Sequence, residues 1–152
     1  MALQYKYLER PKDIDECLKL MQDAIVPLLQ AHWDKRGKEF YGKDFNLNIE
    51  AFVRLWLSGS FSVVLAYDGT KAVGIFVGLR MIPMNFMSQV LQVETCYGET
   101  ADVEKGLYNY IKSIGPILGY DEIWLNTDMN DNGDLLGMKV AGKSEVIRYV
   151  SE

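Results

Sequence analysis

The feature that most constrains the fold is an Asp-Gly pair, Asp68-Gly69, between two runs rich in apolar and β-branched residues. Asp-Gly favours a two-residue hairpin turn, so residues 61–67 and 72–82 are predicted to pair as antiparallel strands. Three consecutive apolar residues, 63–65, put side chains on both faces of the first strand, which predicts helices on both sides of the sheet. Residues 89–96 are predicted to add a third strand to this meander.

Apolar residues at helical spacing precede the meander. Asp13 and Glu16 form a capping-box pattern ahead of apolar residues at helical spacing as far as Leu29. Pro27 is expected to kink this helix or break it into two pieces. Residues 34–47 are polar and contain glycine, and they are interpreted as a loop. Asn48 is predicted to cap a second helix, which Ser58 and Gly59 end.

Helical spacing also follows the meander, where Thr100 is predicted to cap a helix over residues 101–114. Residues 4–9 and 122–126 are predicted as short strands, residues 129–140 as a weak helix and residues 145–150 as a closing strand. The chain lacks an internal repeat or a Pro/Gly-rich linker. We therefore expect one domain over residues 1–152, of α/β (α+β) class, with a mixed sheet and helices on both faces.

Composition excludes several function classes. Apolar residues make up 49% of the chain, enough for a core without disulfides or metals. The net charge is −5 and the basic residues are dispersed, which argues against a nucleic acid partner. The longest apolar runs are only a few residues, so no membrane association is expected. Cys17, Cys96 and the single His32 show no metal-site spacing, so two reduced thiols in a cytoplasmic protein are expected. Asp128 opens a stretch similar to a calcium loop, but Lys139 replaces its bidentate glutamate, which favours a turn.

The order of elements resembles the GNAT N-acetyltransferase superfamily over essentially the whole chain. The family's third-strand pattern, L-x-V-x-P-x-Y, is matched by Leu91, Val93 and Tyr97, with Thr95 at the proline place. In that family the next helix presents backbone amides to the pyrophosphate of acetyl-CoA, as helix N-termini do for anions in general. The resemblance implies that the cofactor would lie against Val93, Thr95, Gly98, Thr100, Ala101 and Asn130.

Two departures from the family bear on the cofactor. Its R-G-x-G-x-G loop is replaced here by residues 98–103, without the arginine. Glu99, Asp102 and Glu104 put three carboxylates where phosphates would lie, and like charges repel. The second family signature matches weakly from Asn130 onward, and Gly137 replaces the tyrosine that often protonates the leaving thiolate.

Glu94 is the candidate general base, because acetyl transfer needs an acceptor amine to lose a proton near the thioester. Simple alternation places Glu94 on the same strand face as Cys96. Its alternative role is a carboxylate on a polar sheet face or in an ion pair. Tyr97 is the candidate acid, with packing as its alternative. His32 is expected to end a helix and to cap it or pack at the surface.

Two functions stay open from the sequence. The first is a GNAT-like N-acyltransferase that moves an acetyl group from acetyl-CoA to a small-molecule or protein amine. The second is a catalytically inactive GNAT-fold binding or structural protein, a type that occurs in bacteriophages. A homodimer and a partner protein are both compatible with the sequence, and no metal is expected.

Overall fold

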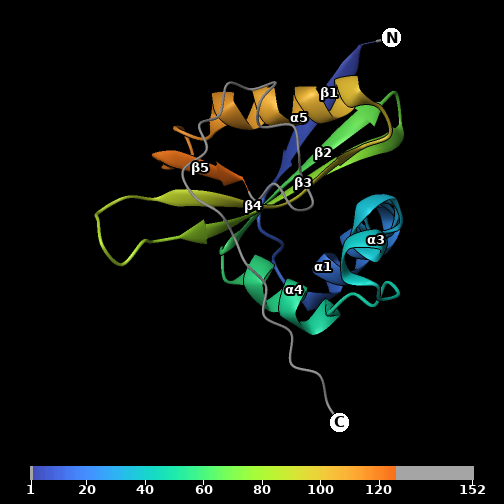
Figure 1. Cartoon of the computed structure of the whole chain (residues 1–152), viewed down its shortest axis with the longest axis horizontal. Coiled ribbons are helices and arrows are strands. Elements are labelled where there is room, and N and C mark those ends of the chain that lie inside the picture. Colours follow the sequence, from blue (N-terminus) through green and yellow to red (C-terminus); the bar gives the residue numbers. More distant parts are fainter. Residues whose placement is uncertain (1, 126–152) are drawn as a thin grey trace.

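The computed structural model describes residues 2–125, and they form a five-stranded sheet between two helical layers (Figure 1). The strands lie in chain order across the sheet. The first four pair antiparallel with their neighbours, and the last pairs parallel with the fourth. The strands are β1 (Leu3–Leu8), β2 (Phe61–Asp68), β3 (Lys71–Met81), β4 (Val90–Gly98) and β5 (Glu122–Leu125).

The predicted meander is confirmed. Asp68 pairs with Lys71 across the turn, and Gly69 has a φ of 63°, which glycine adopts without strain. Val63 and Leu65 are buried in one core, whereas Val64 is buried in the other. The sheet is therefore covered on both faces, as the consecutive apolar residues predicted.

One long helical segment follows β1. It consists of α1 (Ile14–Leu20), η1 (Met21–Ile25), α2 (Val26–His32), η2 (Trp33–Gly37) and α3 (Lys38–Tyr41), where η1 and η2 are π-helical turns. Asp13 caps its start by accepting a hydrogen bond from the Glu16 amide. Pro27 does not break the helix. It is the second residue of α2 and lies just after η1, a wider turn of the kind that takes up irregularities in a helix.

The prediction of a loop over residues 34–47 was wrong for its first half, because the helix continues to Tyr41. Exposed polar side chains dominate this stretch, and its periodicity is interrupted by η2, so the helical signal in the sequence is weak. Gly42, in the left-handed conformation with φ 65°, ends the helix. The other helices were predicted correctly: α4 (Ile49–Leu57), capped by Asn48, and α5 (Ala101–Ile114), capped by Thr100.

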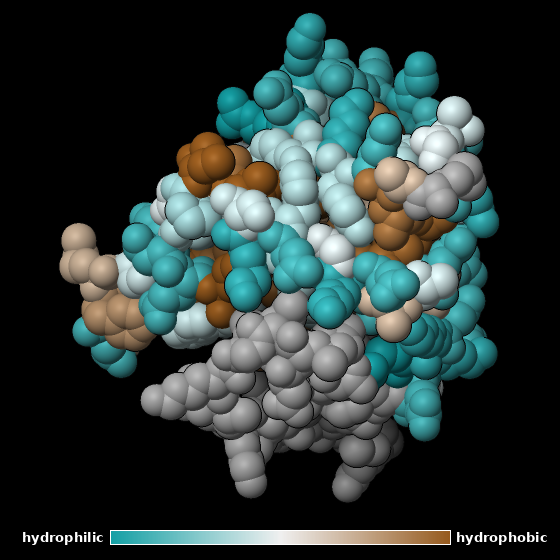
Figure 2. All heavy atoms as spheres, turned by 90° about the horizontal axis from the view of Figure 1, so that it is seen from above, coloured by the Kyte–Doolittle hydropathy of each residue, from teal (hydrophilic) through white to brown (hydrophobic). Residues whose placement is uncertain are grey.

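The helical layers enclose two separate cores. The segments α1 to α4 cover one face, where Cys17, Met21 and Trp56 are buried against β2 and β3. Helix α5 covers the other face with Leu107, Tyr108 and Ile111. From the α5 side, hydrophilic residues cover most of the described surface and hydrophobic ones gather in separate patches (Figure 2).

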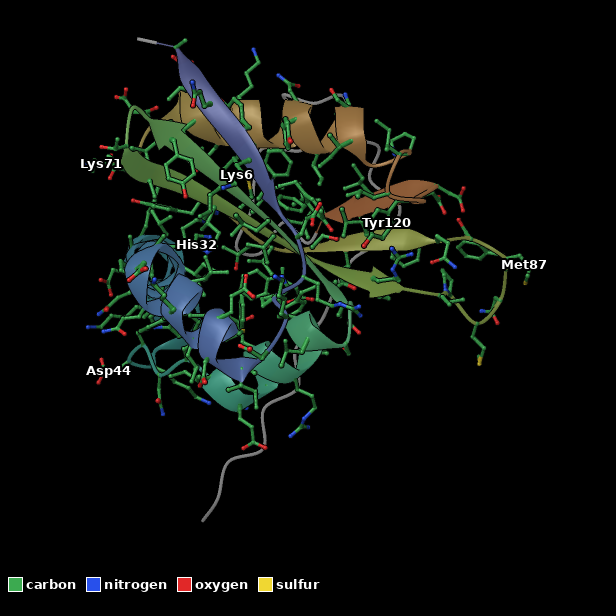
Figure 3. The ribbon with its side chains drawn as sticks, turned by 180° about the vertical axis from the view of Figure 1, so that it is seen from behind. Lys6, His32, Asp44, Lys71, Met87 and Tyr120 are labelled. Carbon is green, nitrogen blue, oxygen red and sulfur yellow. The ribbon has the colours of Figure 1, made fainter. Side chains whose placement is uncertain are left out.

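The β3–β4 connection extends away from both helical layers, with Met87 at its tip, whereas His32 lies between a helix and the sheet (Figure 3). No helix within residues 2–125 is long and apolar enough to cross a membrane. Three predictions lie outside the described residues. They are the end at Asn126 of the strand predicted over residues 122–126, the helix over residues 129–140 and the strand over residues 145–150.

Candidate functional site

A β-bulge in β4 decides where Glu94 lies. Val77 on β3 pairs with Thr95, and the next residue, Gly78, pairs with Val93, so Glu94 is the extra residue between them. The bulge reverses the alternation of β4: Val93 and Cys96 are both buried in the α5 core. The expectation that Glu94 shares a face with Cys96 was therefore wrong. Glu94 and Thr95 instead face the side of the α1–α4 layer.

An open pocket of about 420 Å³ lies between this part of β4 and the long helical segment. Volumes of this size are typical of small-molecule sites. The pocket is lined by Leu29, His32, Trp33, Tyr41, Lys43, Phe45, Leu47, Glu94 and Thr95.

The aromatic wall of the pocket is held in place by the helix itself. Trp33 and Tyr41 stack with ring centroids 5.4 Å apart and an angle of 4° between planes. The Trp33 indole Nε1 donates a hydrogen bond of 2.7 Å to the backbone oxygen of Lys43. Gly37 lies under the Trp33 ring, and a Cβ there would collide with ring atoms. Trp33 is thus fixed by three separate contacts.

Glu94 provides the carboxylate of this pocket. Part of its side chain is exposed, but the surrounding protein removes enough water to raise the pKa of its carboxyl above the ordinary value of 4.5. Desolvation raises a carboxyl pKa because burial disfavours the charged form. A raised pKa makes the carboxylate a stronger base, which suits it to accept a proton from an amine.

Tyr97 lies on the same side of the sheet, next to His32, with ring centroids 6.0 Å apart. The Lys35 Nζ lies 5.8 Å from the centroid of the Tyr97 ring. Tyr97 is not among the pocket-lining residues, so its assignment as the acid stays a prediction. His32 is the last residue of α2, but the helical segment continues past it as η2. The residue is only 3% exposed, so the expectation that it caps a helix or packs at the surface was wrong.

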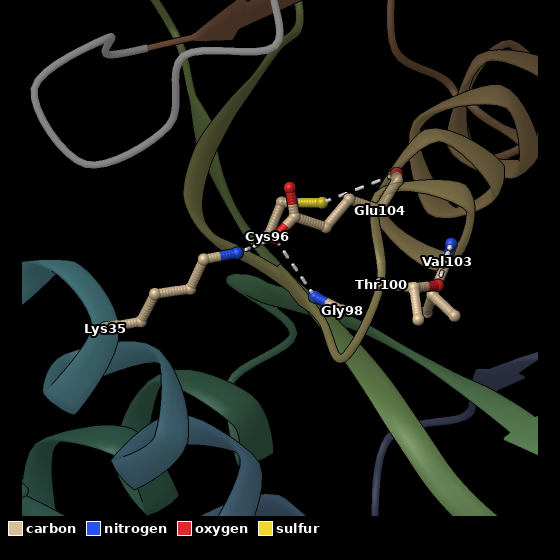
Figure 4. A network of polar contacts seen from close by, with 6 residues as sticks. All are labelled: Lys35, Cys96, Gly98, Thr100, Val103 and Glu104. Carbon is tan, nitrogen blue, oxygen red and sulfur yellow. Dashed lines mark hydrogen bonds and ion pairs between the residues drawn. The ribbon is translucent and has the colours of Figure 1, made fainter.

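The loop from β4 to α5, the predicted cofactor loop, is folded around Glu104 (Figure 4). The Gly98 amide donates a hydrogen bond of 3.3 Å to the Glu104 Oε1, and the Lys35 Nζ forms an ion pair with the same oxygen at 3.3 Å. A Cβ on Gly98 would lie 2.7 Å from the Glu104 nitrogen. A carboxylate of the chain's own therefore takes the amide that would face an anionic ligand.

The other acidic residues of this loop are arranged differently. Glu99 pairs with Lys71 at 3.2 Å, so its charge is partly balanced. Asp102 is exposed in the first turn of α5, and Thr100 Oγ1 accepts a hydrogen bond of 3.4 Å from the Val103 amide. With Glu104 bonded to Gly98, the Gly98 amide is not available to the pyrophosphate of CoA. Binding through this amide would require the Glu104 side chain to move.

The remaining candidates are distributed over the fold. Val93, Thr95, Gly98, Thr100 and Ala101 follow one another along β4 and into α5, whereas Asn130 lies outside the described residues. Cys17 and Cys96 are buried free thiols in different cores. Burial raises the pKa of both thiols. Within residues 2–125, no three His, Cys, Asp or Glu side chains are grouped so as to hold a metal ion.

The sequence did not single out Trp33 or Leu47 as site residues. Tyr41 and Phe45 are aromatic residues within the polar stretch 34–47, and an aromatic residue in such a stretch is a sequence signal for the pocket wall. Their meeting with Glu94 depends on the bulge and on the helix continuing through Tyr41.

No protein-family model matches the sequence, and no curated protein sequence is significantly similar to it. Solved structures, however, are similar over almost the whole chain. A ribosomal-protein-alanine N-acetyltransferase from Brucella melitensis biovar Abortus 2308 has a TM-score of 0.69 at 14% identity, covering 98% of this chain and 100% of that one. An aminoglycoside acetyltransferase from an uncultured soil metagenomic sample, in complex with trehalose, has a TM-score of 0.64 at 15% identity, covering 99% and 95%.

A third structure, AAC(6')-Iy in complex with the bisubstrate analogue CoA-S-monomethyl-acetylneamine, has a TM-score of 0.59 at 14% identity and covers 100% of this chain and 99% of that one. At such identities the likeness concerns the backbone and not the residues of the site. The five-stranded mixed sheet, with helices on both faces, therefore has the fold of the GNAT acetyltransferases.

Proposed function

We propose that this chain is an N-acyltransferase that acylates an amine bound beside Glu94, with acetyl-CoA as the donor. The observation that carries the proposal is the bulge that turns Glu94 into the pocket, where desolvation raises its pKa. Similar folds include acetyltransferases, one of them solved with a CoA-containing bisubstrate analogue, which supports the donor.

The role of Glu94 follows from the protonation of amines. A primary amine near neutral pH is an ammonium ion, which has no free lone pair to attack a carbonyl carbon. The Glu94 carboxylate accepts one proton from the ammonium and leaves the neutral amine in the pocket. Acetyl-CoA would supply the acetyl group as a thioester. Tyr97, which lies on the same side of the sheet beside His32, is proposed as the acid that protonates the leaving CoA thiolate.

A second function is favoured by a different observation. Glu104 takes the Gly98 amide and adds negative charge to the loop where the resemblance would put the cofactor. This arrangement supports a GNAT-fold binding protein that performs no transfer. The two functions differ in whether acetyl-CoA binds at all.

Glu94→Gln tests the first function. Release of CoA thiol from acetyl-CoA, followed in the presence of a panel of primary amines, should fall by about 100-fold or more in the variant, the usual contribution of a general base. Initial rates of the unmodified chain at low amine concentration should rise with pH through the raised pKa of Glu94, because only the carboxylate accepts the proton. Undetectable acetyl-CoA binding by calorimetry, with no thiol release, would leave the binding protein as the function.

The stability of the same variant is a control. The folded protein holds a proton on Glu94 more tightly than the unfolded chain does, so the ionised carboxylate opposes folding at neutral pH. Glu94→Gln should therefore be at least as stable as the unmodified chain at pH 7, measured by urea unfolding. Any gain in the free energy of unfolding should disappear at pH values below 4.5, the ordinary pKa of this carboxyl, because the group is then protonated in both the folded and the unfolded state.

A further inference from the structure

The walls of the Glu94 pocket have a chemistry of their own. Trp33, Tyr41 and Phe45 supply aromatic surface, and Leu29 and Leu47 supply aliphatic surface. Among the lining residues within 2–125, Glu94 is the only carboxylate, and Lys43 is the only lysine. Apolar surface with one acidic group is suited to a ligand that has an apolar body and one positive charge.

From this lining we propose that the pocket takes a small primary amine carried on a flat apolar body, with the ammonium beside Glu94 and the body against the Trp33 side of the pocket. The inference rests on the proposed function, because it names the class of acceptor. It is also a statement about binding, which can be measured without acetyl-CoA.

Two attractions act together on such a ligand. A flat apolar body loses contact with water as it packs against aromatic rings, which is favourable in proportion to the area buried. The ammonium gains a charge-assisted contact with the Glu94 carboxylate. A neutral analogue keeps the first attraction and loses the second.

A polycationic amino sugar fits the same lining poorly. Its several ammonium groups each need an acidic or carbonyl partner once they leave water, and unpaired buried charges are costly. The part of the lining that the structure describes offers one carboxylate, that of Glu94. The pocket therefore selects one amine on an apolar body over many amines on a polar one.

The aromatic wall is formed before any ligand arrives. The Trp33 ring is held by its 2.7 Å hydrogen bond to the Lys43 oxygen and by the stack on Tyr41. Gly37 leaves room for the ring to lie along the helix. A wall that is fixed in advance does not lose side-chain freedom on binding, which favours affinity.

The test is a titration of the ¹⁵N-labelled full chain, without acetyl-CoA, with 2-phenylethylamine, its neutral N-acetyl derivative and the amino sugar neamine. The indole N–H signal of Trp33, assigned by its loss in Trp33→Phe, reports on the pocket. We expect saturable shifts of this signal with 2-phenylethylamine, and binding at least roughly tenfold weaker for the other two compounds. Equal or tighter binding of neamine, or no shift with 2-phenylethylamine, would overturn the inference.

Three variants locate the binding. Glu94→Gln should weaken the binding of 2-phenylethylamine by roughly tenfold and leave the binding of its N-acetyl derivative unchanged. Gly37→Ala, which displaces the Trp33 ring, should weaken the binding of both compounds. Glu50→Gln makes the same carboxyl-to-amide change on α4, outside the pocket lining, and should weaken neither. Binding that is indifferent to Glu94→Gln would contradict the inference even if Gly37→Ala failed to fold.

The outcomes separate this inference from the proposed function. If 2-phenylethylamine binds as expected but no acetyl group is transferred, the proposed function fails and the ligand class stands. If thiol release is observed with neamine and not with 2-phenylethylamine, the proposed function stands and the ligand class is wrong.

Discussion

At the scale of single residues, Glu104 is where the chain departs furthest from a phosphate-binding loop. Its side chain is 13% exposed and lies between the Gly98 amide and the Lys35 ammonium. Glu99 and Glu104 each pair with a lysine, Lys71 and Lys35, so both charges are partly balanced. Glu104 differs because it also accepts a hydrogen bond from the Gly98 amide. We therefore expect Glu104 to oppose acetyl-CoA binding more than Glu99 does.

Glu104→Gln should tighten acetyl-CoA binding by roughly tenfold, because removing a like charge near a surface is worth on the order of 1 kcal/mol or more. Calorimetric titration at low and high salt is the measurement, and the gain should be larger at low salt, where screening is weaker. Glu99→Gln is the matched control and should have a smaller effect. If the two variants gave equal affinities, the pyrophosphate would be held elsewhere.

At the scale of elements, the contact between β1 and α5 depends on a glycine inside a helix. Gly106 lies in the middle of α5, and a Cβ there would collide with the ring and hydroxyl of Tyr5 on β1. Tyr5 in turn stacks on Tyr110 of the same helix, with centroids 5.7 Å apart. The close approach of strand and helix requires a residue without a side chain.

Gly106→Ala should therefore destabilise the protein by about 1 kcal/mol or more through overpacking, although alanine in a helix is usually better than glycine by about 1 kcal/mol. The free energy of unfolding in urea is the measurement. Asn109→Ala, at an exposed position of the same helix, is the control and should stabilise slightly through helix propensity. A stabilised Gly106→Ala would mean that Tyr5 moves aside at no cost.

At the scale of the whole molecule, one sheet carries two cores on its two faces. Leu107 of α5 is fully buried in one core, and Trp56 of α4 is 1% exposed in the other. The strands β2 and β3 contribute side chains to both, so the cores share their backbone. We expect the two faces to unfold as one cooperative unit.

Leu107→Ala should lower stability by about 2–5 kcal/mol, the usual cost of such a cavity. The measurement is the urea transition of Trp56 fluorescence, in a background with Trp33 and Trp124 replaced by phenylalanine, compared with far-UV circular dichroism. Both signals should shift together to lower urea. A Trp56 transition that stayed in place would show that the two faces unfold independently.

Much of the fold follows from local signals that can be recognised in the sequence. The Asp68-Gly69 turn, the caps at Asp13, Asn48 and Thr100, and the apolar run at residues 63–65 each predicted what the structure contains. Such signals are strong because they depend on the backbone conformation and periodicity of neighbouring residues. The fold class and the meander were thereby determined by the sequence itself.

The site was decided by tertiary structure. The bulge at Glu94 arises from pairing with β3, which alternation along β4 alone cannot reveal, and it moves Cys96 to the opposite face. The ion pair between Glu104 and Lys35 joins residues 69 positions apart, whose meeting depends on how α5 and η2 pack. Turns and caps are set by contacts a few residues apart, whereas these contacts exist only after distant segments of the chain have come together.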